Sequence, residues 1–206
     1  MKISLIVPCY NEEEALPFSA KSLTEVLGGL IRNGKVAKNS YILFVDDGSK
    51  DKTWELIEAE AKQNPLIRGL KLSGNVGHQN ALLAGLLTAN EDSDITVSID
   101  ADLQDDVNAI EKMVDAYLGG ADIVYGVRSN RDTDTFFKRF TAEAFYKLIK
   151  KLGGDVVFNH ADYRLMSRRA LEALAEFKEV NLFLRGIIPM IGYRTDTVFY
   201  ERGERF

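Results

Sequence analysis

Asp100 and Asp102 are two carboxylates one residue apart, and they follow the apolar run Ile95–Ile99. A short run rich in β-branched residues is typical of a buried strand, so both carboxylates are expected at the carboxyl end of a strand. In an open α/β sheet, that end is where ligands bind. Two hard oxygen ligands at this spacing suit Mg²⁺ or Mn²⁺ that also holds a substrate diphosphate. The pair therefore predicts chemistry on a nucleotide-linked substrate.

Three more polar clusters follow apolar runs in the same way. They are Pro8–Glu13, Asp46–Asp51 and Gly74–Gln79, and the acidic pair begins a fourth, Asp100–Asp106. Each cluster follows one of the first four expected strands in chain order. Because parallel strands bring their carboxyl ends to one edge of a sheet, we expect the four clusters to converge on one site.

Strands and helices alternate over residues 1–127. The expected strands are Ile3–Val7, Tyr41–Val45, Ile67–Leu72, Ile95–Ile99 and Ile123–Val127. A first helix is expected where an apolar stripe runs from Leu16 to Leu30, and further helices are expected over Thr53–Ala61, His78–Ala89 and Val107–Leu118. Asn11 with Glu14 resembles a capping box before the first helix. Strands separated by helices imply right-handed βαβ units. The sequence therefore predicts an α/β fold with a mostly parallel, Rossmann-like central sheet flanked by helices.

The pattern changes after Gly126. Here the sequence predicts helices over Phe136–Leu152, Arg168–Phe177 and Leu182–Ile188, and strands over Tyr163–Met166 and Thr195–Tyr200. Aromatic residues recur at helical spacing in the first of these helices, and they belong either to the core or to a surface that meets a membrane or a partner. We expect a single domain with two lobes divided near residue 127.

The composition is that of a soluble globular domain. The 206 residues carry a net charge of −5, divided as −9 over residues 1–127 and +4 over residues 128–206. The basic half is either a solvated surface or a surface for phosphate or an anionic membrane. The acidic balance overall argues against a nucleic-acid binder. One cysteine, Cys9, excludes an intrachain disulfide and fits a reducing compartment, and neither a signal peptide nor a spanning segment is expected.

Three motifs together resemble the family 2 glycosyltransferases of the GT-A fold. They are Val-Pro-Cys-Tyr-Asn-Glu at residues 7–12, Val-Asp-Asp-Gly-Ser at residues 45–49 and Asp-Ala-Asp-Leu-Gln at residues 100–104. The sequence is most similar to the polyprenyl-phosphate glycosyltransferases, and the resemblance covers residues 1–206. It implies a catalytic domain whose residues 1–127 bind a nucleotide sugar and whose residues 128–206 face the acceptor. The implied reaction is the inverting transfer of a hexose to polyprenyl phosphate, with UDP-glucose expected ahead of GDP-mannose and UDP-N-acetylglucosamine.

The resemblance also implies a donor site. Its residues are Pro8, Tyr10, Asn11, Glu12, Asp46, Asp47, Gly77, His78, Asp100, Ala101, Asp102 and Gln104. Asp102 is the implied ligand of Mg²⁺ or Mn²⁺, and Asp100 is expected nearer the sugar or ribose. The glycines of the Gly74–Gln79 loop can let backbone N–H groups approach a phosphate. Turns and helix caps remain alternatives for several of these residues, and Asp105 and Asp106 are expected to begin the next helix, where acids suit the dipole.

The acceptor side is expected in the basic half. In the resembling enzymes, basic residues at the places of Arg128, Lys138 and Arg139 hold the lipid phosphate, with Arg131 a weaker candidate. Asp162, in the segment Asp-Tyr-Arg-Leu, resembles an acid near the anomeric carbon and completes the catalytic set with Asp100 and Asp102. It acts as a general base, or it orients groups around an acceptor that is already ionised, or it forms a structural salt bridge. Arg202 and Arg205 fall where the family often has a basic segment that faces the diphosphate.

Two other functions fit the same residues. The acceptor can be a sugar on a polysaccharide or glycoprotein, or the domain can bind nucleotide sugars without catalysis. Many of the resembling enzymes carry membrane helices after the catalytic domain, and none is seen in this chain. We therefore expect either an excised catalytic domain or a protein attached peripherally to the cytoplasmic face of a membrane. Homo-oligomers are possible.

Overall fold

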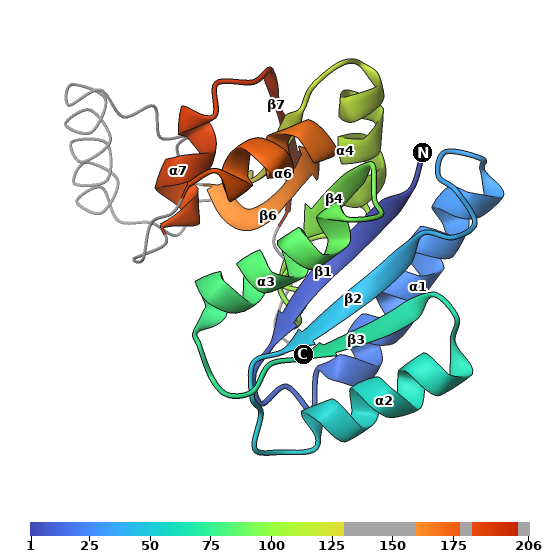
Figure 1. Cartoon of the computed structure of the whole chain (residues 1–206). Helices are drawn as coiled ribbons and strands as arrows, with labels where there is room; N and C mark the ends of the chain where they lie inside the picture. The colour runs from blue at the N-terminus through green and yellow to red at the C-terminus, as the bar shows by residue number, and fades with distance from the viewer. Residues whose placement is uncertain (130–159, 178–182, 202–206) are drawn as a thin grey trace.

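One sheet of seven strands organises the molecule. The computed structural model describes residues 1–129, 160–177 and 183–201. The strands are β1 (Ile3–Cys9), β2 (Tyr41–Asp46), β3 (Ile67–Lys71), β4 (Ile95–Ser98), β5 (Ile123–Arg128), β6 (His160–Ser167) and β7 (Thr195–Tyr200). Their order across the sheet is β3-β2-β1-β4-β6-β5-β7 (Figure 1). β6 pairs antiparallel with β4 and β5, while the other paired strands run parallel, so the predicted mostly parallel α/β sheet is confirmed.

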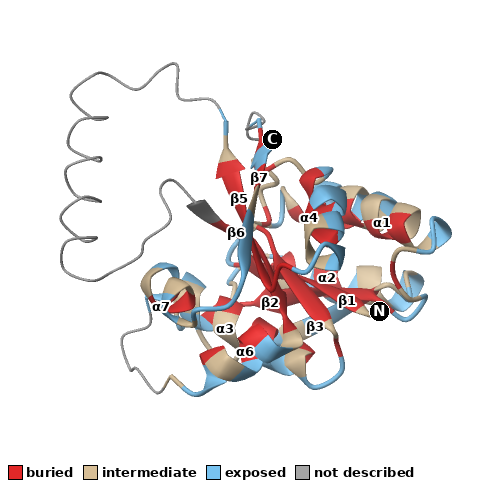
Figure 2. Ribbon diagram, turned by 90° about the horizontal axis from the view of Figure 1, so that it is seen from above, coloured by how far each residue is buried: buried red, intermediate tan, exposed pale blue. Residues whose placement is uncertain are grey.

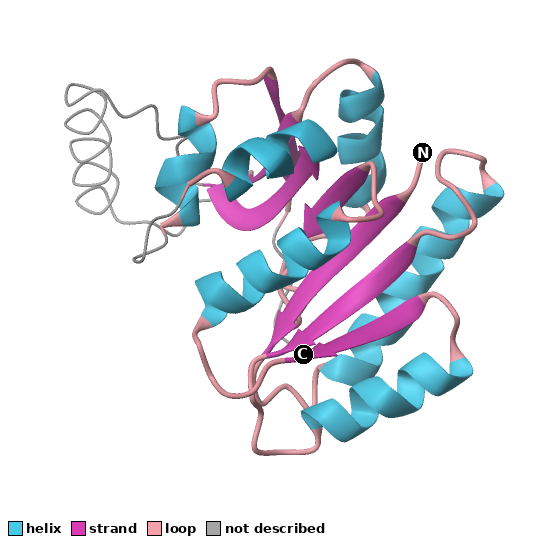
Figure 3. Cartoon of the chain, in the orientation of Figure 1, coloured by secondary structure: helices cyan, strands magenta, loops and turns pink. Residues whose placement is uncertain are grey.

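Helices cover both faces of the sheet (Figure 3). They are α1 (Leu16–Arg32), α2 (Thr53–Gln63), α3 (His78–Asn90), α4 (Ala109–Leu118), α6 (Arg168–Ala175) and α7 (Leu184–Met190). Apolar residues of α1, α2 and α4 form one buried cluster with the sheet, and those of α3, α6 and α7 form a second cluster on the opposite face. Ile42 and Phe44 of β2 join the first cluster while Leu43 and Val45 join the second, because successive side chains of a strand point to opposite faces.

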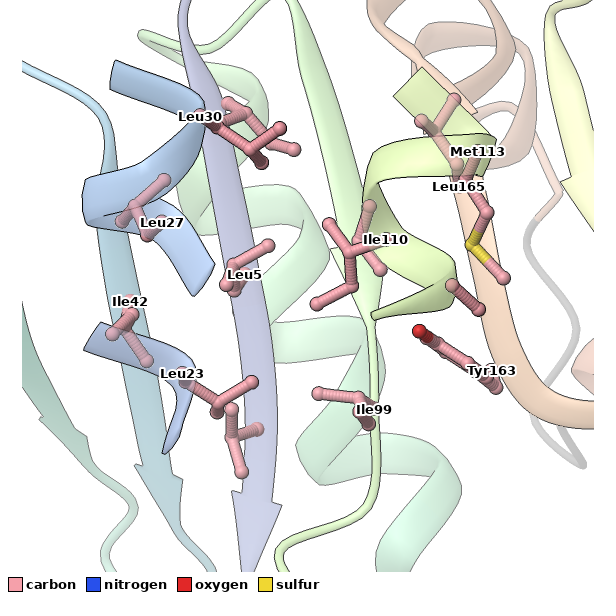
Figure 4. Packing of buried hydrophobic residues seen from close by; sticks show 14 of the residues in the cluster. Leu5, Leu23, Leu27, Leu30, Ile42, Ile99, Ile110, Met113, Tyr163 and Leu165 are labelled. Carbon is pink, nitrogen blue, oxygen red and sulfur yellow. The ribbon is translucent and has the colours of Figure 1, made fainter. Parts of the chain in front are cut away.

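The core explains why these segments take their structures. Leu23, Leu27 and Leu30 recur at helical spacing on α1, and they share a buried cluster with Leu5 of β1 and Ile42 of β2 (Figure 4). Every residue of β1 and β2 is buried, and Figure 2 shows these strands in the interior between the two helical layers. A strand that is covered on both faces needs a continuous apolar run, which is the pattern that predicts β1 and β2 from the sequence.

The first helix begins later than the capping-box pattern predicts. α1 starts at Leu16, has a proline in its first turn, and has no side-chain capping bond at Ala15. Asn11 instead takes a positive φ of 54°, and its Oδ1 accepts a hydrogen bond from the Lys50 backbone N–H at 2.8 Å. The predicted Asn11–Glu14 capping box is therefore wrong, because a tertiary contact with the next loop occupies the asparagine side chain.

The antiparallel strand β6 begins at the edge where the parallel strands end. Ser98 of β4 pairs with Arg164 of β6. In an antiparallel register, the residues before Arg164 lie beside those after Ser98. Asp162 therefore reaches the edge of the sheet that carries Asp100.

The remaining expectations for the second half have mixed outcomes. The predicted strand Tyr163–Met166 is confirmed as the longer β6, and Thr195–Tyr200 is confirmed as β7. The helices predicted near residues 168–177 and 182–188 correspond to α6 and α7. The predicted helix over residues 136–152 lies outside the described residues. Among the helices of the described segments, none combines the length and apolar character needed to cross a membrane.

Candidate active site

A cavity of about 300 Å³ lies at the carboxyl ends of β1 and β4. These strands are neighbours in the sheet. From β1, the chain first adds β2 and β3 on one side and then adds β4 on the other side, so the strand order reverses between β1 and β4. Such a reversal leaves a crevice where open α/β sheets bind ligands. The lining residues are Pro8, Cys9, Tyr10, Glu12, Asp47, Asn75, Gly77, His78, Ala81, Asp100, Ala101 and Asp102. All four polar clusters predicted from the sequence thus contribute to one cavity.

A tight turn presents the acidic pair to this cavity. The Leu103 backbone N–H donates to the Asp100 carbonyl oxygen at 3.3 Å, and Leu103 takes a positive φ of 46°. The Gln104 N–H donates to Asp102 Oδ1 at 3.3 Å. A positive φ is unfavourable for a branched side chain, and such backbone strain clusters at functional sites. Gln104 lies in this turn but is not among the lining residues.

The surroundings of Asp100 favour a cation. Burial raises the pKa of the Asp100 carboxyl, and the carboxylates of Asp105, Asp162 and Asp102 raise it further, while His78 opposes the rise. A carboxylate in such surroundings is costly to ionise until positive charge comes near. The acidic pair therefore sits where a bound cation would gain from neutralising several negative charges.

The Asp46–Asp51 cluster holds the Gly74–Gln79 cluster in place. Asp47 lines the cavity, and its two carboxylate oxygens accept the backbone N–H groups of Val76 at 2.7 Å and Gly77 at 3.0 Å. Asp47 therefore occupies these two N–H groups, and the expectation that backbone N–H groups of this loop approach a phosphate stays a prediction for the others. Gly48 is also in close contact, since a Cβ atom there would lie 2.7 Å from the Gly74 carbonyl carbon.

Asp46 and Asn11 lie beside the cavity without lining it. Asp46 is fully buried, and its Oδ1 accepts the Ser49 backbone N–H at 3.1 Å, which is the turn alternative foreseen from the sequence. Asn11 contacts the Ser49–Lys50 loop. Pro8, Tyr10 and Glu12 do line the cavity. The tertiary structure thus separates the predicted donor-binding residues into those that face the cavity and those that support it.

Asp162 lies at the centre of a polar cluster beside the acidic pair. Its carboxylate accepts hydrogen bonds from Gln79 Nε2 at 3.2 Å, from buried Arg164 at 2.5 Å and from Arg185 Nη2 at 3.1 Å. His78 Nε2 lies 3.5 Å from Asp162 and 3.6 Å from Asp100. The imidazole therefore links the cavity wall to Asp162.

The proton affinity of Asp162 follows from these partners. Burial by itself would raise the pKa of the Asp162 carboxyl, but hydrogen bonds from His78 and Arg185 and the charge of Arg164 hold it well below its usual range. The hydrogen bond to Asp162, together with the charge of Asp100, raises the pKa of His78 against the effect of burial. Asp162 is thus an ionised carboxylate at neutral pH and a poor acceptor for a proton.

Comparison of the chain with known proteins shows its family. Residues 4–175 match Glycosyl transferase family 2. The chain belongs to this family. The chain is 55% identical over 204 residues to the uncharacterized glycosyltransferase YkoT of Bacillus subtilis. This match spans 99% of the chain and 60% of YkoT. The chain is 42% identical over 206 residues to a prophage bactoprenol glucosyl transferase homolog of Escherichia coli, and this match spans 100% of the chain and 65% of the relative.

Solved structures share the fold of this family 2 glycosyltransferase. Mannosyl-3-phosphoglycerate synthase from Rubrobacter xylanophilus superposes with a TM-score of 0.68 at 16% identity, over 100% of this chain and 67% of its own. Glucosyl-3-phosphoglycerate synthase from Mycobacterium tuberculosis, in complex with Mn²⁺, UDP and phosphoglyceric acid, superposes with a TM-score of 0.62 at 18% identity. This superposition covers 100% of this chain and 71% of the synthase. The GT-A fold and the family resemblance predicted from the motifs are both confirmed.

The carboxylates that line the cavity suit a cation that is shared with a phosphate-bearing ligand. No group of three His, Cys, Asp or Glu residues that could hold a metal occurs in the described part of the chain. Asp100 and Asp102 nevertheless line one wall of the cavity. Mg²⁺ and Mn²⁺ accept one or two carboxylates when phosphates and water complete their coordination. The residues present therefore fit a cation that arrives with a diphosphate rather than one caged by the protein.

The Arg128 side chain is held by a buried carboxylate, that of Asp105. Its Nη2 and Nε lie 2.9 and 3.1 Å from Asp105 Oδ1, and the Tyr200 hydroxyl donates to the same oxygen at 2.7 Å. Asp105 is 2% exposed and precedes α4. The expectation that Asp105 begins the next helix is therefore wrong, because its carboxylate turns inward to an arginine and a tyrosine. Asp106 also precedes α4, which starts at Ala109, and its Oδ1 accepts the backbone N–H of the N-cap residue Asn108.

Several functional candidates lie outside the described residues or were missed by the motifs. Lys138, Arg139, Arg131, Arg202 and Arg205 fall outside the described ranges, so their roles remain predictions. Sequence reasoning did not single out Arg185, Gln79 or Asn75 as site residues. Gln79 and Asn75 belong to a cluster that was noticed, whereas Arg185 is in a separate helix and carries no local signal. Its place in the site depends on how α7 packs against α3 and β6.

Proposed function

We propose that this chain transfers a hexose from a nucleotide sugar to polyprenyl phosphate, with UDP-glucose as the first candidate donor. The phosphate oxygen of the acceptor attacks the anomeric carbon while the bond from that carbon to the donor diphosphate breaks. In-line attack inverts the anomeric configuration. Residues 1–127 would form the nucleotide-sugar-binding half, and residues 128–206 the acceptor-side half.

The ion pairing of Asp162 carries this proposal. A sugar hydroxyl acceptor needs a base to remove its proton, but Arg164, Arg185 and His78 pair with the Asp162 carboxylate and lower its proton affinity, which makes it a weak base. An acceptor phosphate is largely ionised at pH 7, because its second pKa is about 6, and it needs no such base. We assign Asp162 the role of orienting Arg185 and His78 and of stabilising positive charge at the anomeric carbon.

The acidic pair serves the leaving group in this proposal. Asp102 would hold Mg²⁺ or Mn²⁺, which when bound offsets the negative charge that builds on the leaving nucleoside diphosphate. Asp100 would lie closer to the donor sugar or ribose. The loop walls of Pro8, Tyr10, Glu12 and Asp47 would enclose the nucleotide, and the neighbouring proteins whose structures contain Mn²⁺ with UDP or GDP-mannose support such a donor.

Basic side chains would receive the acceptor. Arg128 ends β5 at the same edge of the sheet, and a planar guanidinium suits phosphate oxygens. Lys138 and Arg139 would add to this charge. The names of relatives 42% identical over the whole chain, such as the bactoprenol glucosyl transferase of Shigella phage SfV, support a polyprenyl phosphate acceptor. The chain spans 60% to 65% of the length of these relatives, and attachment at the cytoplasmic face of a membrane is part of the proposal.

A donor and acceptor panel tests the proposal. The chain is incubated with UDP-glucose, GDP-mannose or UDP-N-acetylglucosamine, a short polyprenyl phosphate and MnCl₂, and the products are identified by mass spectrometry. We expect glucosyl transfer to the lipid phosphate, lost with excess EDTA. Asp102→Asn should reduce the rate by about 10²–10³-fold, whereas Asp115→Asn, at an exposed surface pair with Lys35, should leave it unchanged.

Three outcomes would contradict the proposal. Transfer to an oligosaccharide but never to the lipid phosphate would assign a sugar acceptor instead. Donor binding without turnover on any acceptor would indicate a binding module. Full transfer in the presence of EDTA, or by Asp102→Asn, would remove the metal assignment.

A further inference from the structure

We propose that the loop after β1 and the loop after β2 form a staple that positions the donor-binding wall of the cavity. The staple consists of Asn11–Glu13 on one side and Ser49–Thr53 on the other. Asn11 acts within it as a positioning residue, so that it supports Tyr10 and Glu12 without contacting the donor itself. The proposal rests on nucleotide binding in the proposed function, and it is independent of the acceptor.

Three successive backbone N–H groups of the first loop donate to side chains of the second. Asn11 N–H donates to Ser49 Oγ at 3.0 Å, Glu12 N–H to Thr53 Oγ1 at 2.8 Å and Glu13 N–H to Asp51 Oδ2 at 3.1 Å. Side chains with acceptor oxygens at these three positions therefore match the three donors one by one. A single such bond would be an ordinary loop contact, but bonds from three consecutive residues fix the path of the backbone.

The second loop donates back to side chains of the first. Lys50 N–H donates to Asn11 Oδ1 at 2.8 Å, and Lys52 N–H donates to Glu13 Oε2 at 3.0 Å. The bonds in both directions make the loops depend on each other. The motif residues Asn11 and Ser49 therefore have partners within the protein.

Asn11 has the backbone conformation that this arrangement requires. Its φ of 54° lies in the left-handed region, which asparagine tolerates better than most residues with a Cβ atom. Tyr10 and Glu12 on either side of it line the cavity, and Asn11 does not. The turn at Asn11 thus sets the directions in which its two neighbours face the donor.

The staple is anchored to rigid parts of the fold. Thr53 is fully buried at the start of α2, and its backbone N–H donates to Asp51 Oδ1 at 3.0 Å. The Asp47 N–H donates to the Cys9 carbonyl oxygen at 2.9 Å and extends the pairing of β1 with β2 to the cavity edge. A wall held in this way loses little conformational entropy when a ligand binds, which strengthens binding.

Calorimetry with UDP and GDP, each in MnCl₂, tests the staple on the whole 206-residue chain. Asn11→Ala removes the Oδ1 acceptor and disfavours the left-handed turn, so the Kd of the nucleotide that binds should rise by about tenfold or more. Asn11→Gly keeps the turn and loses the acceptor, so its rise should be about fivefold. Thr53→Val removes the acceptor of the Glu12 N–H and should also raise the Kd by about fivefold. Thr53→Ser keeps the hydroxyl and should bind with the affinity of the wild type. Thr24→Val is the matched control, because Thr24 Oγ1 accepts a hydrogen bond from Asn64 between α1 and the end of α2.

The outcomes separate the staple from the proposed function. Wild-type affinity in Asn11→Ala and Thr53→Val would overturn the staple and leave the donor assignment standing. A wild-type chain that binds neither nucleotide would overturn both. Amide hydrogen exchange gives a readout without ligand: the amides of residues 11–13 should be protected in the wild type and exchange faster in Thr53→Val than in Thr24→Val. Unprotected amides in the wild type would also overturn the staple.

Discussion

Asp100 and Asp162 are carboxylates at the same edge of the sheet, yet their neighbours give them opposite proton affinities. Burial and nearby carboxylates raise the pKa of Asp100, whereas two arginines and His78 hold that of Asp162 low despite its burial. Asp162 is therefore a fixed anion, and Asp100 gains from any cation nearby. Partners distant in sequence contribute to both proton affinities: His78 acts on Asp100, and Arg185 acts on Asp162.

Asp122 permits a prediction about pH at the scale of one residue. Its carboxylate accepts Ser167 Oγ at 2.9 Å and is paired with Arg169, whose hydrogen bond lowers the pKa of Asp122. Because the folded-state pKa lies below the unfolded value of about 3.9, the ionised carboxylate stabilises the fold above that pH. This contribution is lost as the pH falls through the folded-state pKa. Asp122→Asn should lower the Tm at pH 7 by about 3 °C.

Thermal unfolding of wild type and Asp122→Asn from pH 7 to pH 2 measures this effect. The Tm difference between them should shrink toward the acid end. Asp196→Asn, at an exposed position, should show little difference at any pH. A Tm difference for Asp122→Asn that is constant with pH would contradict the assigned role of its charge.

Helix α3 connects the core to the site at the scale of a secondary-structure element. Its first residues, His78 and Gln79, contact Asp162, while Gln79 Oε1 also accepts the Leu184 backbone N–H of α7 at 3.3 Å. Its middle packs on β1 and β2, and Gly85 lies so close that a Cβ atom would come within 2.5 Å of Ile6 Cγ2 and 2.8 Å of Val45 Cγ2. The depth at which α3 packs on the sheet therefore sets the position of His78.

Gly85→Ala should destabilise the fold although alanine favours helices. Overpacking against Ile6 and Val45 should cost about 1–3 kcal/mol of unfolding free energy, and the displaced helix should slow transfer. Gly29→Ala in α1 is the matched control, because a Cβ atom there has ordinary contact distance, and it should stabilise by about 0.5–1 kcal/mol. Urea unfolding and the transfer assay measure both. If Gly85→Ala raised the unfolding free energy as much as Gly29→Ala, helix α3 would be able to shift away from the sheet without loss of stability.

At the scale of the whole molecule, the edge strand β7 reaches the loop that follows the central strand β4. β7 forms one edge of the sheet, and its Tyr200 reaches Asp105 in the loop that follows β4. The Tyr200 ring also packs edge-to-face on Tyr163 of β6, with ring centres 5.2 Å apart. The last strand thus contributes to the position of a turn that lies almost 100 residues earlier in the chain.

Tyr200→Phe tests this long-range link. The substitution keeps the ring and removes a hydrogen bond to a carboxylate, so the unfolding free energy should fall by about 1.5–3 kcal/mol. Mn²⁺-dependent nucleotide binding should weaken as well, because the acidic turn loses a support. Phe199→Ala, at a side of β7 that is exposed, should change stability by less than about 0.5 kcal/mol. Unaltered nucleotide affinity in Tyr200→Phe would show that the turn is held without β7.

Local patterns in the sequence are sufficient for much of the fold. The runs at Ile3–Val7 and Tyr41–Val45 lie within the observed β1 and β2 because strands buried on both faces need continuous apolar residues. The convergence of the polar clusters follows from parallel strand direction alone. The capping box at Asn11 and the helix start at Asp105 fail for one shared reason, since both side chains bind partners in other loops or strands.

The sequence by itself determined the α/β class, the family and the edge of the sheet where the polar clusters converge, because periodicity and short motifs are local properties. The tertiary structure decided which polar residues line the cavity and which support it. It also decided that Asp162 is paired with Arg164 and Arg185, and that Asp105 holds Arg128. These facts depend on antiparallel β6 entering between β4 and β5 and on the packing of α7, and such long-range pairings leave no local pattern in the chain.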